Sequence, residues 1–246
     1  MSPTRSDNLR GAAIMVVAVG SFALMDAGLK VLSPHYSPLQ VAALRGLASL
    51  PIAAIWVALQ GGFAQLVRVR FGLHVVRGVL GIVALATFAY GLRGLPLSET
   101  YSIFFVAPLL ITLFAALFLG ERIGRRRWLA IAAGFAGALI VLRPTGRGAL
   151  TLSGLAILAT AVAYAWSAVT VRVLGRTDST PSMVFWLMAM VAAGAGALAL
   201  PSWRPIQPAH WKVIAGIAVT GSLGQWGITE AFRRSQASFI APIEYT

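Results

Sequence analysis

The chain has 246 residues, of which 58% are hydrophobic and 11% charged, against about 45–50% and about 25% in an ordinary soluble domain. This composition excludes a soluble globular protein, and the absence of cysteine excludes disulfides, thiolate metal sites and a cysteine nucleophile. The formal net charge of +13 fits either a nucleic-acid partner or a membrane protein with basic loops, so the placement of the basic residues decides between them.

Apolar runs that could cross a bilayer core, which takes about 20 residues in a helix, recur along the chain. They are separated by short loops rich in turn residues, such as "LSPHYSP" and "RPTGRG", which leave no room for a soluble domain. The sequence therefore predicts an all-α polytopic membrane protein with eight spans and the start of a ninth. The predicted spans are Leu9–Leu32, Pro38–Leu59, Gly72–Arg93, Ser98–Leu119, Trp128–Leu142, Leu152–Leu174, Ser182–Leu200, Trp211–Phe232 and a segment from Ala237 onward.

The basic residues in the loops and near the span ends are unevenly distributed between the two sides of the membrane. With the N-terminus in the cytoplasm, twelve of them fall on the cytoplasmic side and six on the opposite side. Because basic loops favour the cytoplasm, this predicts a multi-pass protein of the cytoplasmic (inner) membrane with a cytoplasmic N-terminus. The basic excess is then explained by topology, and no nucleic-acid partner is expected.

Several stretches of the chain resemble one another at nearly one offset. "ALMDAGLKVL" lies over "AWSAVTVRVL" at an offset of 142 residues, which matches Lys30 to Arg172, and the same offset brings "TFAY" over "TEAF". After a slip of two residues, "LSETYSIFFV" lies over the final stretch "ASFIAPIEYT". If the first copy has five spans, an odd number, the second copy begins on the opposite side of the membrane. Such inverted repeats are typical of secondary transporters with a site near the midplane between the two halves.

The repeat predicts two units, residues 1–145 and residues 146–246, in a ten-helix 5+5 arrangement. The final stretch corresponds to the start of the fourth span. We therefore expect the second unit to be truncated after the start of its ninth helix.

The segment "PLLITLFAALFLGERIGRRRWLAIAAGFAGALIVL" combines a proline in the fourth span, a Gly-Glu-Arg exit at Gly120, Glu121 and Arg122, and a fifth span rich in small residues. Together with "SFALMDAGLK" and "PLQVAALRGL", it resembles the EamA-type carriers of the drug/metabolite transporter superfamily. The narrower similarity is to the YddG-type exporters of aromatic and other amino acids. The resemblance covers essentially the whole chain and implies ten helices in two inverted copies.

Ionisable side chains inside apolar spans are costly, so they are candidates for function. Asp26 and Lys30 have the i,i+4 spacing of a helix-face pair near the outer mouth, and Arg45 lies at a similar depth. The three side chains could form a static salt-bridge cluster or an outer gate that captures a substrate carboxylate. Three others lie near span ends, where snorkelling or helix-end electrostatics accounts for them without a function: Arg77, Glu99 and Glu230.

A carrier of amphipathic metabolites needs a cavity with aromatic faces and a few polar groups. Counting depth from the span ends gives a set of predicted substrate-binding residues, for each of which ordinary helix packing is the alternative. They are Ser21, Phe22, Tyr101, Ser102, Tyr164, Trp166, Ser167, Ser222, Gln225, Trp226, Glu244 and Tyr245. Pro108 removes a helix hydrogen bond in the fourth span and Pro242 flanks Glu244, so both prolines are predicted hinges.

Catalysis has little support in the sequence. The three histidines lie at span ends, and there is no HExxH motif or phosphate-binding glycine-rich loop with a lysine, so no enzyme, metal or cofactor is predicted. We expect a secondary transporter that moves small metabolites outward by alternating access, with aromatic or apolar amino acids as substrates and the lipid bilayer as its surroundings. A channel-like or scaffold membrane protein, or a carrier of the same fold for another metabolite or drug, is the alternative. Import, and proton coupling as opposed to facilitated diffusion, also stay open at this point.

Overall fold

The computed structural model describes residues 5–121, 124–142 and 151–235, together with Phe239 and Ile243. Within these residues every regular element is a helix, as the composition predicts. The α-helices are α1 (Arg5–Leu32), α2 (Pro38–Leu59), α3 (Phe71–Gly94), α4 (Leu97–Phe104), α5 (Ala107–Leu119), α6 (Arg125–Leu142), α7 (Leu152–Leu174), α8 (Thr180–Ala199) and α9 (Trp211–Arg234). Short 3-10 turns lie at Phe63–Leu66, Leu200–Ser202 and Pro208–His210.

Six segments of the described chain are long and apolar enough to cross a membrane, judged by length and composition. They are Arg10–Leu32, Pro38–Leu59, Phe71–Gly94, Leu97–Leu119, Leu152–Leu174 and Thr180–Ser202. Helices α6 and α9 also match predicted spans but are not among these six. Helix α6 begins with three arginines, and α9 carries polar residues along its length, including Lys212, Gln225 and Glu230, which lower the mean hydropathy of each segment.

The predicted fourth span, Ser98–Leu119, is not one continuous helix in the structure. It is divided into α4 and α5, with Phe105 and Val106 between them. Pro108 lies in the first turn of α5, where its missing N–H and its ring prevent the helix from continuing unbroken. The interruption of helical hydrogen bonding expected at Pro108 is therefore present, and α5 ends at Gly120, whose φ of +66° favours glycine.

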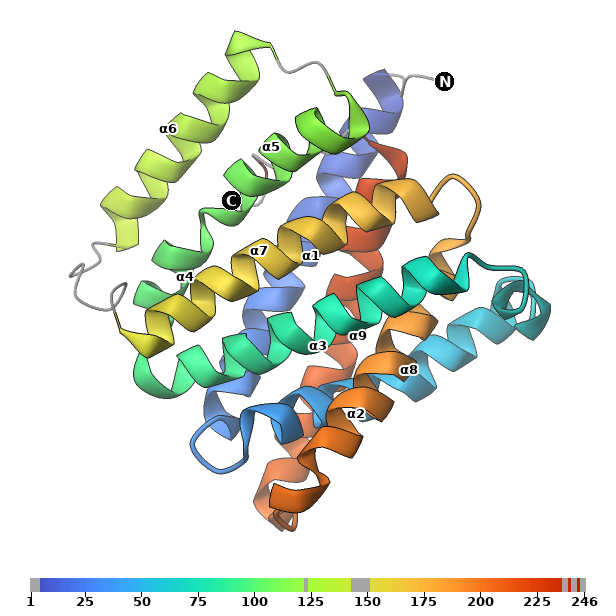
Figure 1. The fold of residues 1–246 in the computed structure, drawn as a ribbon, viewed down its shortest axis with the longest axis vertical. Helices are drawn as coiled ribbons and strands as arrows, with labels where there is room; N and C mark the ends of the chain where they lie inside the picture. Colours follow the sequence, from blue (N-terminus) through green and yellow to red (C-terminus); the bar gives the residue numbers. More distant parts are fainter. Residues whose placement is uncertain (1–4, 122–123, 143–150, 236–238, 240–242, 244–246) are drawn as a thin grey trace.

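Helices of the first half of the chain pack against helices of the second half. The most extensive contacts pair α1 with α9, α2 with α8, and α3 with α7; α3 also contacts α8, and α2 also contacts α9. In Figure 1, α3 and α7 run side by side in front of α1 and α9.

Small residues allow two of these pairs to approach closely. A Cβ on Gly46 of α2 would lie 2.7 Å from the backbone nitrogen of Ala192 in α8, and a Cβ on Gly28 of α1 would lie 2.7 Å from the Ile217 side chain in α9. Membrane helices associate through such close packing because lipid tails are as apolar as the side chains, so the hydrophobic effect does not drive helices together.

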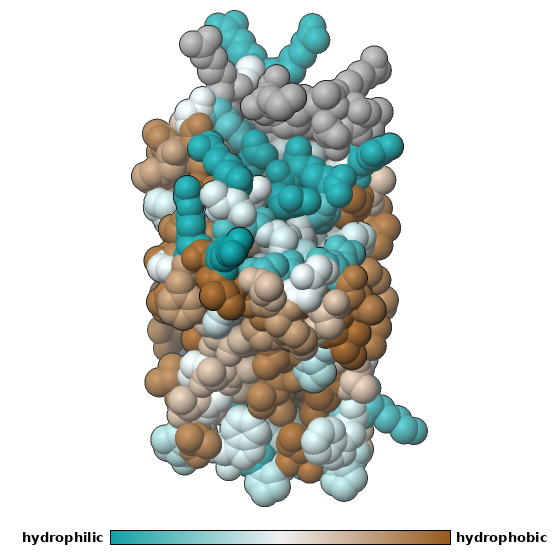
Figure 2. Space-filling model, turned by 90° about the vertical axis from the view of Figure 1, so that its right-hand side faces the viewer, coloured by the Kyte–Doolittle hydropathy of each residue, from teal (hydrophilic) through white to brown (hydrophobic). Residues whose placement is uncertain are grey.

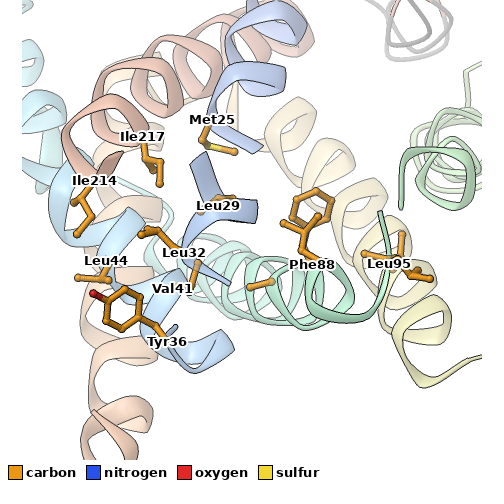
Figure 3. Close-up of a cluster of buried hydrophobic side chains, with 13 residues drawn as sticks. Met25, Leu29, Leu32, Tyr36, Val41, Leu44, Phe88, Leu95, Ile214 and Ile217 are labelled. Atoms are coloured by element: carbon orange, nitrogen blue, oxygen red, sulfur yellow. The ribbon is translucent and has the colours of Figure 1, made fainter. Parts of the chain in front are cut away.

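A buried apolar cluster joins α1, α2, α3 and α9 at the end of the bundle where α1 terminates. Figure 3 shows Met25, Leu29 and Leu32 of α1 facing Ile214 and Ile217 of α9. On the outer face shown in Figure 2, hydrophobic side chains cover the middle of the molecule, and hydrophilic side chains gather toward its upper end. This distribution is the one expected for a bundle whose middle lies in lipid.

Candidate functional site

A cavity of about 340 Å³ lies inside the bundle, among α1, α2, α3, α4, α7, α8 and α9. Its lining is mostly apolar and includes seven of the residues singled out in the sequence: Phe22, Asp26, Arg45, Tyr101, Tyr164, Ser167 and Gln225. These side chains come from five helices, α1, α2, α4, α7 and α9, which belong to both halves of the chain. The fold therefore gathers polar groups and aromatic rings from both halves of the chain into one space, as ligand sites within helix bundles do.

Asp26 of α1 is buried, with 7% of its surface exposed, and faces this cavity. Its Oδ2 accepts a hydrogen bond of 2.8 Å from the hydroxyl of Tyr101 in α4. The predicted pairing of Asp26 with Lys30 is wrong. The Lys30 ammonium instead donates to the backbone carbonyls of Leu92 and Leu95 at the end of α3, because these carbonyls have no partner within their helix.

Arg45 of α2 is 4% exposed and also faces the cavity. Its Nε lies 3.0 Å from Met25 Sδ, a weak acceptor, and its Nη2 donates to Gln225 Oε1 at 3.4 Å. The guanidinium carbon lies 5.7 Å from the centre of the Phe22 ring, within reach of a cation–π interaction. No ion pair joins Arg45 to a carboxylate within the described residues, so much of its donor capacity is left for a ligand.

Aromatic rings form one wall of the cavity. Phe104 of α4 lies 5.4 Å from Tyr164 of α7 and 6.3 Å from Phe88 of α3, measured between ring centres. Tyr101 stacks on Phe105 with ring centres 6.2 Å apart. Rings held in such contacts offer a rigid apolar surface to a flat or apolar ligand.

Arg77 of α3 also lines the cavity, although its position near a span end did not predict a place in the site. Arg77 was expected to snorkel toward a membrane surface, yet it is 1% exposed. Its Nη1 donates to the carbonyl of Met183 at 2.7 Å and its Nη2 to Thr229 Oγ1 at 3.1 Å. The signal that could have revealed it is the one used for Arg45: a basic residue about two turns inside an apolar span.

Five other predicted residues do not line the cavity. Ser21 and Ser102 donate to the backbone carbonyls of Val17 and Ser98 in their own helices. Trp166 packs on Phe114 and Phe118 of α5, with ring centres 5.0 Å and 4.6 Å away. Ser222 and Trp226 line a separate apolar hollow between α2, α8 and α9. Each of them shares a helix with a lining residue but faces another direction.

The remaining predicted residues are not in the cavity lining or are not described. Pro108 is buried at the start of α5 and is not among the residues lining the cavity. Glu244, Tyr245 and Pro242 lie outside the described residues. Their predicted roles in binding and as a hinge therefore stay predictions.

Comparison with known proteins identifies the family. A model of the EamA-like transporter family matches residues 9–143, more than half of the chain. The chain belongs to this family. Members of the family are transporters, so the protein is a multi-pass membrane transporter of the drug/metabolite transporter superfamily and not an enzyme.

Three relatives match this chain over most of their own length. A riboflavin transporter of Vibrio cholerae serotype O1 is 28% identical over 241 residues, which cover 96% of this chain and 80% of that protein. The pseudopaline exporter CntI of Pseudomonas aeruginosa is 27% identical, covering 96% and 82%. An S-adenosylmethionine uptake transporter of Rickettsia prowazekii is 25% identical, covering 96% and 80%. These relatives are all transporters of small metabolites.

A solved crystal structure has the same fold as this EamA-like chain. Its TM-score is 0.74 at 20% sequence identity, and the match covers 98% of this chain and 86% of the other. At this identity the likeness concerns the fold alone.

Proposed function

We propose that the cavity is the substrate site of a carrier that exports amino acids with aromatic or apolar side chains across the inner membrane by alternating access. The observation that carries the proposal is the convergence of Asp26, Arg45 and an aromatic wall on one cavity. A carboxylate and a guanidinium are complementary to the ammonium and carboxylate groups of a zwitterion. The rings of Phe104 and Tyr164 provide the surface for its side chain.

Arg45 is the anchor for the substrate carboxylate in this proposal. Its planar guanidinium can donate two parallel hydrogen bonds to a carboxylate, and its present partners, a thioether and a long amide contact, are easily replaced. Asp26 receives the substrate ammonium. The Tyr101 hydroxyl donates to Asp26 Oδ2 in the structure, so an arriving ammonium competes with Tyr101 for this oxygen.

The helix contacts support the inverted repeat on which alternating access depends. Under the offset found in the sequence, α1, α2 and α3 correspond to α7, α8 and α9. The contact of α1 with α9 then corresponds to that of α7 with α3, the contact of α3 with α8 corresponds to that of α9 with α2, and the contact of α2 with α8 corresponds to itself. All of these contacts are present, as a twofold relation between residues 1–145 and 146–246 requires.

A side-chain contact repeats in the same way. Lys30 near the end of α1 donates to carbonyls at the end of α3, and its counterpart Arg172 near the end of α7 donates to the carbonyls of Phe232 and Arg233 at the end of α9, each at 3.4 Å. The two cations thus bind equivalent helix ends.

Riboflavin is a second candidate substrate. It is favoured by the riboflavin transporter of Vibrio cholerae, which is similar over 96% of this chain, and by the aromatic wall, which suits a flat ring system. The Asp26 and Arg45 pair favours the zwitterion over it.

Counterflow in proteoliposomes tests the proposal. The purified complete protein is reconstituted, the vesicles are preloaded with unlabelled phenylalanine or riboflavin, and entry of the same labelled compound is followed. Entry stimulated by the preloaded compound, saturating with concentration, supports a carrier and shows which substrate it takes. Current or flux without counterflow would support the channel alternative, and no flux of either compound would overturn the proposal.

A further inference from the structure

Arg77 is the buried cation of the cavity that the zwitterion does not use. Its guanidinium lies at the cavity wall with 1% of the side chain exposed, and its Nε has no hydrogen-bond partner. Its two partners, the Met183 carbonyl and the Thr229 hydroxyl, are uncharged. Burying an ionised group without an opposite charge is costly, so its presence here requires compensation from another source.

The protein's own nearby carboxylates are engaged elsewhere. Asp178 binds His74 with Oδ2 and Nε2 2.7 Å apart. Glu230 binds the arginines that follow it on α9 and accepts the Thr180 hydroxyl. Within the described part of the chain, no ion pair reaches Arg77.

The cavity therefore has an excess of positive charge. Among the described residues that line it, Asp26 is the only carboxylate, whereas Arg45 and Arg77 are both guanidiniums. A low-dielectric cavity lined with a net positive charge attracts anions and concentrates them. A zwitterion that pairs with Asp26 and Arg45 would leave the charge of Arg77 unmatched.

A polar stripe on α9 connects the two arginines and sets their spacing. Arg45 donates to Gln225, Gln225 donates to Thr229 at 3.2 Å, and Arg77 donates to the same Thr229 hydroxyl. Gln225 and Thr229 are one turn apart, a rise of about 6 Å. The two guanidiniums thus lie at the two ends of this stripe, and a ligand that spans the stripe can contact both.

We propose that the preferred substrates carry a second acidic group, a carboxylate or phosphate, at the end of the aromatic body opposite the amino-acid group, and that Arg77 binds it. The inference rests on the proposed function, because it assumes that substrate occupies this cavity. It changes the substrate class from neutral zwitterions to anions. Arg77 is then a specificity-determining residue, and Thr229 positions its guanidinium.

Three amino acids that differ only at the far end of the ring test this inference: phenylalanine, 4-carboxyphenylalanine and 4-carbamoylphenylalanine. The carbamoyl group has the shape of the carboxylate without its charge. Dissociation constants are measured by tryptophan fluorescence on the purified protein, and counterflow is measured in proteoliposomes. We expect 4-carboxyphenylalanine to bind at least about tenfold more tightly than the carbamoyl compound, because a hydrogen-bonded charge pair is worth this much or more. Riboflavin and its 5′-phosphate form a second matched pair.

Variants then assign the preference to Arg77. Arg77→Gln is expected to remove the preference for the carboxylate while leaving the affinity for the carbamoyl compound within about twofold, and Arg77→Lys should retain part of the preference. Arg10→Gln removes the same charge from an exposed position on α1 and should leave the preference intact. If Arg77→Gln does not fold, Thr229→Val is measured instead and should reduce the preference without removing a charge.

The possible outcomes separate the inference from the proposed function. Counterflow of all three amino acids with equal affinities, or a preference that survives in Arg77→Gln, would overturn the inference and leave the carrier standing. No binding and no flux of any compound would overturn both.

Discussion

The structure contains two buried polar regions that differ in how completely their groups are paired. The first is the cavity, where Asp26 has one tyrosine partner and Arg45 binds a thioether and a distant amide oxygen. The second, which we call the end cluster, consists of His74, Asp178, Thr180, Glu230, Arg233 and Arg234, where α3, α8 and α9 meet. In the end cluster every carboxylate has a cationic or potentially cationic partner within ion-pair distance, whereas among the described residues no carboxylate lies within that distance of Arg45 or Arg77.

The difference separates polar groups that hold the fold from polar groups that are available to a ligand. A buried charge that is paired and hydrogen-bonded within the protein has little to gain from a substrate. A buried guanidinium with unused donors gains strongly when a carboxylate arrives. Substitutions in the end cluster should therefore change stability, and substitutions in the cavity should change binding.

Asp178→Ala is expected to have the largest effect. It removes the carboxylate that binds His74 and that also accepts from the Arg70 backbone N–H at 3.4 Å, and a buried hydrogen bond to a charged group is worth up to about 3 kcal/mol. The thermal unfolding midpoint in detergent should fall, while the dissociation constant for phenylalanine changes less than about twofold in the folded fraction. Asp178→Asn keeps the shape and should cost less. Weakened binding at unchanged stability would contradict the division between the two regions.

Arg45→Gln tests the opposite half of the comparison. Losing a charge-assisted contact to the substrate carboxylate should weaken phenylalanine binding by about 2 kcal/mol, or about 30-fold. Stability should change little, because the partners left behind, a thioether and an amide that also bonds Thr229, are not charged. Tryptophan fluorescence titration gives the affinity, and Arg45→Lys should fall between the variant and the unchanged protein. A large loss of stability at unchanged affinity would place Arg45 among the structural groups.

The sequence predicted where the helices lie better than which side chains meet. Hydropathy and turn residues placed the ends of α2 and α7 at the residues where the structure has them, because a long apolar run between breakers has few alternatives. Asp26 and Arg45 line the same cavity, yet Lys30, which was grouped with them, donates to backbone carbonyls instead. Spacing along one helix could not show that the free carbonyls of α3 lie closer.

The sequence also could not show in which direction each side chain points. Trp166 and Ser167 are adjacent in α7, but only Ser167 reaches the cavity while Trp166 packs on α5. Arg77 was assigned to a membrane surface on its depth alone. Depth can be counted from a span end, whereas the direction of a side chain depends on the rotation of the helix against its neighbours, which only the assembled bundle fixes.

Tyr101→Phe tests whether the hydrogen-bond partner of Asp26 in the cavity limits the binding of substrate. If the Tyr101 hydroxyl competes with the substrate ammonium for Asp26, its removal should tighten phenylalanine binding by about 1 kcal/mol, or about fivefold. The ring remains able to stack on Phe105. Binding of 3-phenylpropionate, which lacks the ammonium, should not change and serves as the matched ligand control. Weaker binding of phenylalanine alone would mean that the Tyr101 hydroxyl contacts the substrate and does not compete with it.

Lys30→Met and Arg172→Met are expected to have the smallest effects. They test whether corresponding positions in the two halves contribute equally to stability. Each cation is half-buried and donates to the free carbonyls at a helix end, an interaction worth about 0.5–1 kcal/mol. Both variants should lower the unfolding midpoint by similar small amounts, with Arg172→Met slightly worse because Arg172 also lies 3.6 Å from Glu121. Lys212→Met, at an exposed position, is the control and should have no effect. If only one of the two variants lowers the unfolding midpoint, the two halves are not equivalent at these positions. A functional twofold relation requires that the matched cations Lys30 and Arg172 contribute similar amounts to stability.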